Sequence, residues 1–282
     1  MYSNTDLQNT FTEIDGKQFH QRVDAQAAVS LKHDGDRTRL DRLYQRGSAK
    51  IRFPKHHDGP MEAVLINTAG GLTGGDKVSW NIRLDNHCKM VATTQACEKS
   101  YKSVGGEAVV ETSLSLGRKS RLHWLPQETI LYDGSALQRT FRVDMEADAE
   151  LLALESVILG REAMGEAVAS LRFHDHWRIS KNNALVFADD LRLTNRISTA
   201  AGFGAHRALA SLLFIAPSGE EERLALVTHL REICAGLIAG FSSFNGKITG
   251  RILARDSYQL RHILVPVLDH LRGIGLPRVW RI

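Results

Sequence analysis

The stretch Asn67–Ser103 has the sequence NTAGGLTGGDKVSWNIRLDNHCKMVATTQACEKSYKS and decides the fold class of the chain. It opens with four glycines in six residues, at positions 70, 71, 74 and 75, which allow backbone angles that a side chain would forbid. Apolar residues then occupy every second position from Val78 to Leu84, as in a strand with one buried face. Asp85-Asn86 is typical of a turn, and Met90–Thr94 of a second strand. The stretch therefore predicts a glycine-rich turn that leads into a β-hairpin.

Three passages of the sequence resemble one another at a nearly constant interval. They cover positions 88–95, 120–127 and 149–156, and each follows an alternating strand and a polar turn. Such a repeat is typical of stacked β layers, although ordinary antiparallel hairpins produce a similar pattern. In this register Glu155 aligns with Pro126 and Ser156 with Gln127. Glu155 and Gln127 are therefore expected at equivalent ends of neighbouring layers.

The remaining elements follow from hydrophobic periodicity and turn residues. Further strands are predicted at 23–31, 38–44, 48–54, 63–66, 110–116, 141–145, 167–173, 176–180, 184–187, 191–193, 208–215 and 246–254. Amphipathic helices are predicted at about 220–239 and 256–272, the second interrupted by Pro266 and ending near Gly273. The expected fold is mainly β, with a stacked β-layer core that is either solenoid-like (a β-helix) or sandwich-like and two C-terminal helices. We expect a flexible leader at 1–20 and a single domain at 21–282, with its β core at about 21–215 and 246–254.

Composition excludes several classes of protein. The 282 residues are 43% hydrophobic and 24% charged, and the 36 Lys and Arg are interleaved with 32 Asp and Glu, so we expect no nucleic-acid partner. The polar N-terminus does not resemble a secretory signal, and no apolar run is long enough to cross a membrane, which predicts a cytoplasmic protein with no membrane partner. Three cysteines without CxxC spacing argue against a disulfide framework or a structural zinc site.

Four short motifs carry a family resemblance. They are NTAGGLTGGD at 67–76, TTQACEKSYKS at 93–103, LPQETILYDG at 125–134 and LGREAMGE at 159–166. In this order and at these separations they resemble the urease accessory protein family UreD, also called UreH, from about Arg42 to the C-terminus. The resemblance implies a non-enzymatic scaffold that joins UreF and the GTPase UreG on apo-urease. It also implies help in moving nickel to the buried urease active site, with no tightly bound cofactor and at most transient Ni²⁺.

Acidic and polar residues in or beside these motifs are the candidates for a functional interior. They are Asp76, Thr93, Thr94, Glu98, Gln127, Glu128, Glu155, Arg161 and Glu166. Oxygen donors bind a hydrated divalent cation loosely, which suits passing a metal on better than storing it. The resemblance implies a nickel route through the β core, and these side chains are expected to line it. The alternative is that the acids form ordinary ion pairs with Arg161, Lys99 and Lys102.

Other patterns in the sequence predict little chemistry. The glycine-rich loop ends in Gly75-Asp76-Lys77, and an aspartate there would repel a phosphate, so the loop is not a P-loop. His56-His57, His87-Cys88 and the pair His174 and His176 are weak candidates for metal ligands, and no dedicated metal site is expected.

A β-solenoid carbohydrate-active enzyme is the alternative function. It would use paired carboxylates such as Glu155 and Glu166, which must face each other across a sugar cleft. The sequence shows no aromatic platform around them, because the four tryptophans are scattered at 80, 124, 177 and 280. We therefore expect no enzymatic activity.

Overall fold

The computed structural model describes residues 22–55, 59–161, 164–194 and 203–280, together with the backbone of two short strands, β1 (Glu13–Ile14) and β2 (Lys17–Gln18). β1 and β2 pair with each other in antiparallel orientation. The predicted leader at 1–20 falls otherwise outside the described residues. Among the described residues, no helix is long and apolar enough to cross a membrane.

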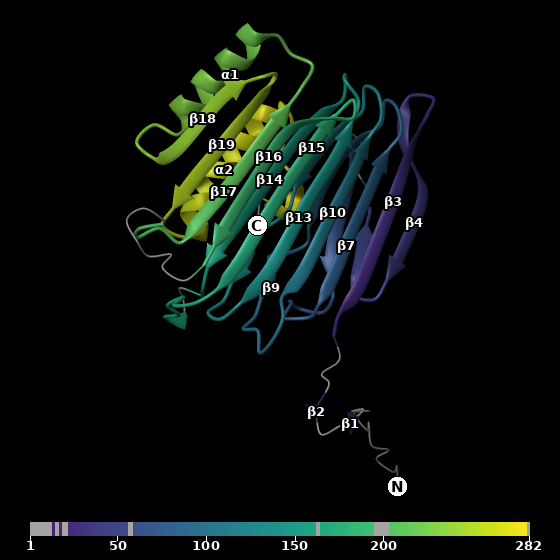
Figure 1. The fold of residues 1–282 in the computed structure, drawn as a ribbon. Helices are drawn as coiled ribbons and strands as arrows, with labels where there is room; N and C mark the ends of the chain where they lie inside the picture. The colour runs from purple at the N-terminus through teal and green to yellow at the C-terminus, as the bar shows by residue number, and fades with distance from the viewer. Residues whose placement is uncertain are drawn as a thin grey trace.

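The first of two large sheets, called sheet I here, has seven strands and forms the near layer of Figure 1. In spatial order they are β16 (Ala184–Leu193), β15 (Arg172–Lys181), β13 (Ala136–Met145), β10 (Ala108–Leu116), β7 (Lys77–Leu84), β3 (Asp24–Asp34) and β4 (Arg37–Arg46). The five inner strands are parallel to one another, whereas β4 and β16 are antiparallel to their neighbours. An antiparallel strand therefore closes each end of a parallel array.

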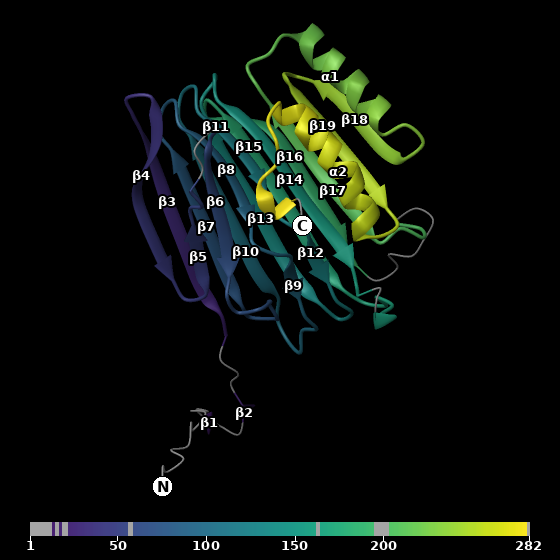
Figure 2. The ribbon, with the colours of Figure 1, turned by 180° about the vertical axis from the view of Figure 1, so that it is seen from behind.

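The second sheet, called sheet II, has ten strands and faces the viewer in Figure 2. Its main path is β18 (Ile238–Phe244), β19 (Lys247–Ala254), β17 (Ala208–Ile215), β14 (Glu150–Leu159), β11 (Arg121–Leu125), β8 (Lys89–Thr94), β6 (Met61–Asn67) and β5 (Ala49–Arg52). Two short strands, β9 (Glu98–Ser100) and β12 (Thr129–Leu131), pair with each other, and β12 also pairs with β14.

The chain crosses from sheet I to sheet II three times in the same way. β7 leads through a turn to β8, β10 to β11, and β13 to β14. The predicted hairpin of 78–84 with 90–94 is therefore wrong, because β7 pairs with β3 and β10 while β8 pairs with β6 and β11. Two alternating strands joined by a polar turn can pair with each other as a hairpin or enter different sheets, so the local sequence could not distinguish these two arrangements.

The stacked-layer prediction is confirmed by the register of these strands. Met90 pairs with Leu122, and Leu122 pairs in turn with Leu151. The step from Met90 to Leu122 equals the step between the passages that begin at 88 and 120, and the step from Leu122 to Leu151 equals that from 120 to 149. The core is thus a solenoid-like stack in which each layer contributes one strand to each sheet.

The part of sheet II around β14 is covered on both faces, which explains the uninterrupted burial of β14 after its first residue. Leu151, Ala153 and Val157 face the apolar layer between the sheets, and alternate residues such as Leu154 pack under the helices. The helices are α1 (Glu220–Ile233) and α2 (Ser257–Arg272), and Figure 2 shows α2 lying across β17 and β19. A 3-10 helix, Arg278–Trp280, follows α2.

The predicted second helix, 256–272, is confirmed within one residue. Asp256 caps its first turn by accepting a hydrogen bond from the backbone N–H of Gln259 at 2.7 Å. Gly273 ends it with a left-handed φ of 64°.

Several other predicted boundaries differ. β13 begins at Ala136 rather than at 141, and the strands predicted at 167–173 and 176–180 are one strand, β15. The first helix ends at Ile233 rather than 239, because Gly236 turns the chain with a φ of 77° into a strand, β18, that helical spacing had concealed. Residues 167–171 are not a strand, and β15 begins at Arg172. The backbone N–H groups of Ala169 and Ser170 donate to the side chain of Asp133, so they are not available for hydrogen bonds to a neighbouring strand. The strands predicted at 184–187 and 191–193 are one strand, β16.

Candidate functional site

A cavity of about 230 Å³ lies between the two sheets, beyond the ends of β8 and β11. The exposed residues Gln95, Ala96 and Lys99 line one part of it, and the buried residues Arg139 and Glu155 line another. The cavity therefore extends from the surface segment between β8 and β9 into the interior of the stack. Gln127 lies in the same lining, as its predicted alignment with Glu155 implied.

A slip in register opens this space. β11 pairs with β14 through Trp124 and Ala153, and pairing resumes in β12 with Thr129 opposite Val157. Four residues, 125–128, thus stand opposite three, 154–156, so the chain bulges at Leu-Pro-Gln-Glu. The next layer has a similar bulge. Thr93 pairs with Leu125 and Glu98 pairs with Thr129, so the four residues 94–97 stand opposite the three residues 126–128. Two consecutive bulges leave side chains unable to fill the gap between the sheets.

Three buried charged residues from three strands, called the inner ion triad here, lie at the deep side of the cavity: Glu155, Arg139 and Asp175. Arg139 donates to both carboxylate oxygens of Asp175 at 2.9 and 2.7 Å, and its Nη1 lies 2.5 Å from Oε2 of Glu155. Trp124 Nε1 donates to Glu155 at 2.8 Å. Both carboxylates therefore accept hydrogen bonds from fixed donors. Of these two acids, Glu155 is the one that lines the cavity.

Burial sets the protonation behaviour of the inner ion triad. It raises the pKa of Glu155 to about 7, a rise that the charge of Arg139 opposes and that of Asp175 reinforces. Burial alone would lower the pKa of Arg139, but the two carboxylates hold it above its ordinary value. Arg139 is consequently a fixed cation, and Glu155 is the group that gains or loses a proton near neutral pH.

The rim of the cavity is tied to α2 through Gln127, which lines the cavity, and through Glu128, the next residue along the chain. Cys97 Sγ donates to Oε2 of Glu128 at 3.4 Å, and Arg261 of α2 donates to the same oxygen at 2.8 Å and also to Gln127. Burial and the charge of Glu128 raise the pKa of Cys97 to about 12, so the thiol stays protonated and is a poor metal ligand. Glu98 accepts from Asn67 at 3.0 Å, and burial raises its pKa. The rim thus offers chiefly oxygen donors.

Asp76 does not line the cavity; it holds the glycine-rich loop in place. Its carboxylate accepts hydrogen bonds from the backbone N–H of Val23 at 2.8 Å and of Thr73 at 2.7 Å, and its side chain is buried. Gly74 is needed there because a Cβ would lie 2.1 Å from the backbone oxygen of Gly105.

We expect Asp76→Ala to lower the free energy of unfolding by about 1–3 kcal/mol, because two part-buried backbone N–H groups would lose their acceptor. Urea denaturation of the purified chain measures this change. Asp85→Ala is the matched control: Asp85 stands at the other end of β7 and is exposed, and its side chain pairs with the exposed Arg83 at 3.3 Å. Equal losses in the two variants would contradict the role assigned to Asp76.

Arg161 and Glu166 form an ion pair away from the cavity lining. Glu166 accepts from Arg161 Nε at 2.9 Å and from the backbone N–H of Asp133 at 3.1 Å. Glu166 therefore forms an ordinary ion pair with Arg161, which is the alternative that the sequence left open for these acids. Thr94 lines the cavity, whereas Thr93, the next residue along β8, is buried on the opposite face of the strand.

The histidine candidates are dispersed. His174 and His176 lie on the outer face of β15, His87 is exposed in a turn, and Cys88 is buried, where desolvation raises its pKa to about 11. His56 and His57 lie outside the described residues.

Sequence reasoning missed Arg139 and Asp175, although a signal was present. Both occupy positions where the alternation of their strand calls for an apolar side chain, between Leu137 and Phe141 and between Phe173 and Trp177.

Two of the scattered tryptophans, at 80 and 124, also meet in the cavity lining. Glu155 and Glu166 do not share that lining, so the paired acids of the enzyme alternative are not brought together.

The chain matches a known protein family over most of its length. A family model described as "UreD urease accessory protein" matches residues 23–281. The chain belongs to this family. UreD relatives include the urease accessory protein UreD of Rhizobium johnstonii, 45% identical over 267 residues that cover 93% of this chain and 96% of the relative. The urease accessory protein UreD of Sinorhizobium medicae is 45% identical over 273 residues, which cover 92% and 96%. UreD membership confirms the resemblance seen in the four motifs and gives the chain an accessory role in urease maturation, which fits a non-enzymatic protein.

Proposed function

We propose that this chain is a scaffold that binds apo-urease together with UreF and the GTPase UreG, and that it assists GTP-dependent nickel insertion into urease. Nickel, the cargo of this process, would use the cavity between the sheets as a polar passage. The observation that carries the proposal is Glu155, a buried carboxyl whose pKa is raised to about 7 and which lines a cavity that extends to the surface. We also infer that the protein acts in the cytoplasm.

The charge of the inner ion triad suits brief occupancy by a cation. With Glu155 ionised, two carboxylates and one guanidinium leave a single net negative charge in a buried site. An arriving divalent cation replaces the proton on Glu155, since a cation stabilises the ionised carboxylate as Arg139 does. The fixed positive charge of Arg139 then keeps binding weak, so that the ion can leave.

The cavity lining supplies oxygen contacts for the cargo. Glu98, Asn67 and Gln127 carry carboxylate and amide oxygens and line the same cavity as Glu155. Oxygen ligands exchange faster than thiolates, and the protonated Cys97 does not trap the metal. The passage would therefore hand nickel on without storing it.

The outer face of α1 and α2 is the surface we assign to UreF. Two apolar side chains there are exposed, Leu224 by 49% and Tyr258 by 74%, and Arg261 of α2 reaches from this layer to the cavity rim. A partner seated on the helices would thus contact an element that borders the passage.

Co-purification with a tagged chain tests the proposal. The tagged chain should retain UreF, UreG and the urease subunits, and apo-urease should gain nickel in a GTP-dependent assay only when the chain is present. Leu224→Lys should weaken retention of UreF, whereas Leu185→Lys, on the exposed outer side of β16, should not. Equal nickel loading with and without the chain, or no retained partner, would overturn the proposal.

A further inference from the structure

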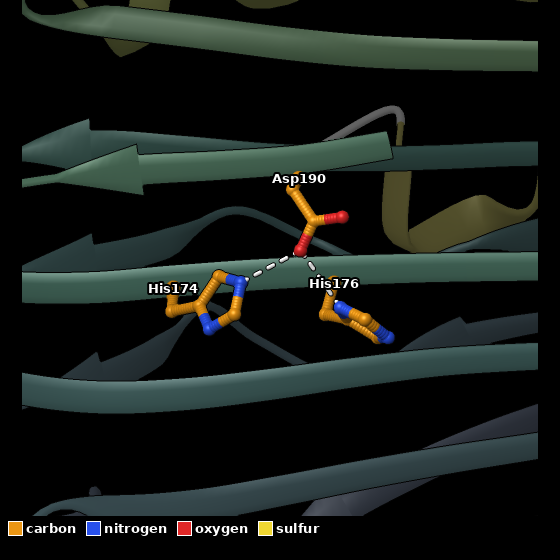
Figure 3. A group of neighbouring side chains, drawn as sticks. All are labelled: His174, His176 and Asp190. Atoms are coloured by element: carbon orange, nitrogen blue, oxygen red, sulfur yellow. Dashed lines mark hydrogen bonds and ion pairs between the residues drawn. The ribbon is translucent and has the colours of Figure 1, made fainter. Parts of the chain in front are cut away.

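A cluster of His174, His176 and Asp190 lies outside the cavity, on the exposed face of sheet I. Figure 3 shows the two imidazoles, from alternate positions of β15, turned toward one carboxylate oxygen of β16. His174 Nε2 lies 2.8 Å and His176 Nδ1 2.7 Å from Oδ1 of Asp190. In the part of the chain that the structure describes, this is the one group of three His, Cys, Asp or Glu side chains whose ligand atoms lie within 4.8 Å of one another.

Strand geometry builds this cluster. Residues two apart on a strand share a face, so His174 and His176 both point outward while Asp175 between them points inward to Arg139. Asp190 stands directly opposite His176 in the antiparallel pair β15 and β16. The sequence pair alone suggested two donors; the cross-strand register supplies the third.

A cation outside the cluster orients the carboxylate. Arg178 Nη2 donates to Oδ2 of Asp190 at 2.8 Å and Nη1 donates to the backbone oxygen of Trp177 at 2.7 Å. Arg178 thus turns Oδ1 toward the imidazoles, as outer partners of metal ligands commonly do.

We propose that His174 Nε2, His176 Nδ1 and Asp190 Oδ1 form a binding site for one first-row divalent ion of the class that imidazole prefers, Ni²⁺, Zn²⁺ or Cu²⁺. Ligands at right angles around a metal with bonds of about 2.1 Å stand about 3.0 Å apart, so the observed nitrogen–oxygen separations need to open only slightly. The ion replaces the contacts between the two rings and Asp190, and each imidazole that binds it in the neutral form carries its proton on its other nitrogen.

The site leaves room for water and for exchange. Three protein ligands leave coordination positions open, and the side chains of His174, His176 and Asp190 are 29%, 25% and 34% exposed. Two further cations face outward at neighbouring register positions, Arg192 opposite His174 and Arg142 opposite Arg178, but both are exposed and screened by water. A bound ion could therefore exchange with solvent at this surface site. The site is separate from the cavity and independent of the passage proposed above.

Calorimetric titration of the full chain with NiCl₂ and, separately, ZnCl₂ tests the site. Wild type should bind one equivalent that is lost or weakened at least about tenfold in both His176→Gln and Asp190→Asn. Glu155→Gln should retain it, which separates this site from the cavity. His33→Ala is the matched control, because His33 and His87 are another surface pair with ring centroids 5.7 Å apart, the same separation as in His174 and His176.

Two further readouts identify the ligands. X-ray absorption of the nickel-bound chain should show imidazole scattering that falls in His176→Gln, and nickel should raise the Tm of wild type but not of Asp190→Asn. Unchanged Tm of the metal-free variants confirms that they fold. Equal metal affinity in wild type and both ligand variants, or no saturable binding in wild type, would overturn the proposal.

Discussion

Arg139→Met is expected to lower the free energy of unfolding by roughly 3–5 kcal/mol, the range for removing one partner of a buried ion pair. The variant leaves Asp175 in the core without the guanidinium that binds both of its oxygens. Urea denaturation monitored by tryptophan fluorescence measures the loss, since Trp124 and Trp177 donate to the two carboxylates of the triad.

The same strand provides the control for Arg139. Arg142 points outward from β13 and is exposed, so Arg142→Met should change stability by less than about 0.5 kcal/mol. The double variant Arg139→Met with Asp175→Asn should recover part of the loss, because Asp175 is no longer a buried unpaired charge and Glu155, the other partner of Arg139, can become neutral by taking up a proton. If the Arg139 and Arg142 variants unfold at the same urea concentration, Arg139 does not hold the core together as described.

Glu155→Gln is expected to slow nickel incorporation into apo-urease roughly tenfold, the factor that a loss of about 1.4 kcal/mol in cation binding gives. Glutamine keeps the shape of the side chain and one acceptor oxygen, which can serve either Trp124 or Arg139, but it cannot ionise. Nickel content of urease after a timed activation reaction measures the effect. Glu111→Gln, exposed on the outer side of β10, should load nickel at the wild-type rate.

The pH dependence of stability checks that Glu155 behaves as described before nickel is involved. Between the ordinary pKa of 4.5 and the folded-state value of about 7, the folded chain keeps a proton on Glu155 that the unfolded chain releases. Lowering the pH through this window therefore stabilises the folded state at this group, and raising it above 7 removes that contribution. The difference between wild type and Glu155→Gln should show this slope, and a flat difference would argue against a raised pKa.

Sequence periodicity was sufficient for the layers and for α2, and it located the start of α1 but not its end. The step from each repeated passage to the next recurs as strand register, and Asp256 and Gly273 bound α2. Local pattern failed where distant contacts decide the outcome. β7 and β8 have partners in other layers, and β18 follows α1 after a glycine that permits a sharp turn. Turn residues say that the chain reverses, but not which strand it then meets.

The candidate interior was predicted in part. Glu155, Gln127, Glu98 and Thr94 meet in one cavity, because the repeat places them at the same level of successive layers. Asp76 and Glu166 belong to backbone and ion-pair contacts instead, which motif membership could not distinguish. The partners of Glu155 could have been sought as charged residues at inward positions of alternating strands. The bulges that open the cavity result from one-residue differences between layers and have no composition signal.

The wall of the cavity depends on residues very far apart along the chain. The backbone oxygen of Leu125 accepts from Trp280 Nε1, 155 residues later, and Glu128 binds Arg261 across 133 residues. Closing loops of this length has an entropic cost that neighbouring layers do not share, so these contacts should form late in folding. A chain captured before that step would present the Leu-Pro-Gln-Glu segment bare, and we expect such a folding intermediate to be the form most exposed to proteases and to self-association.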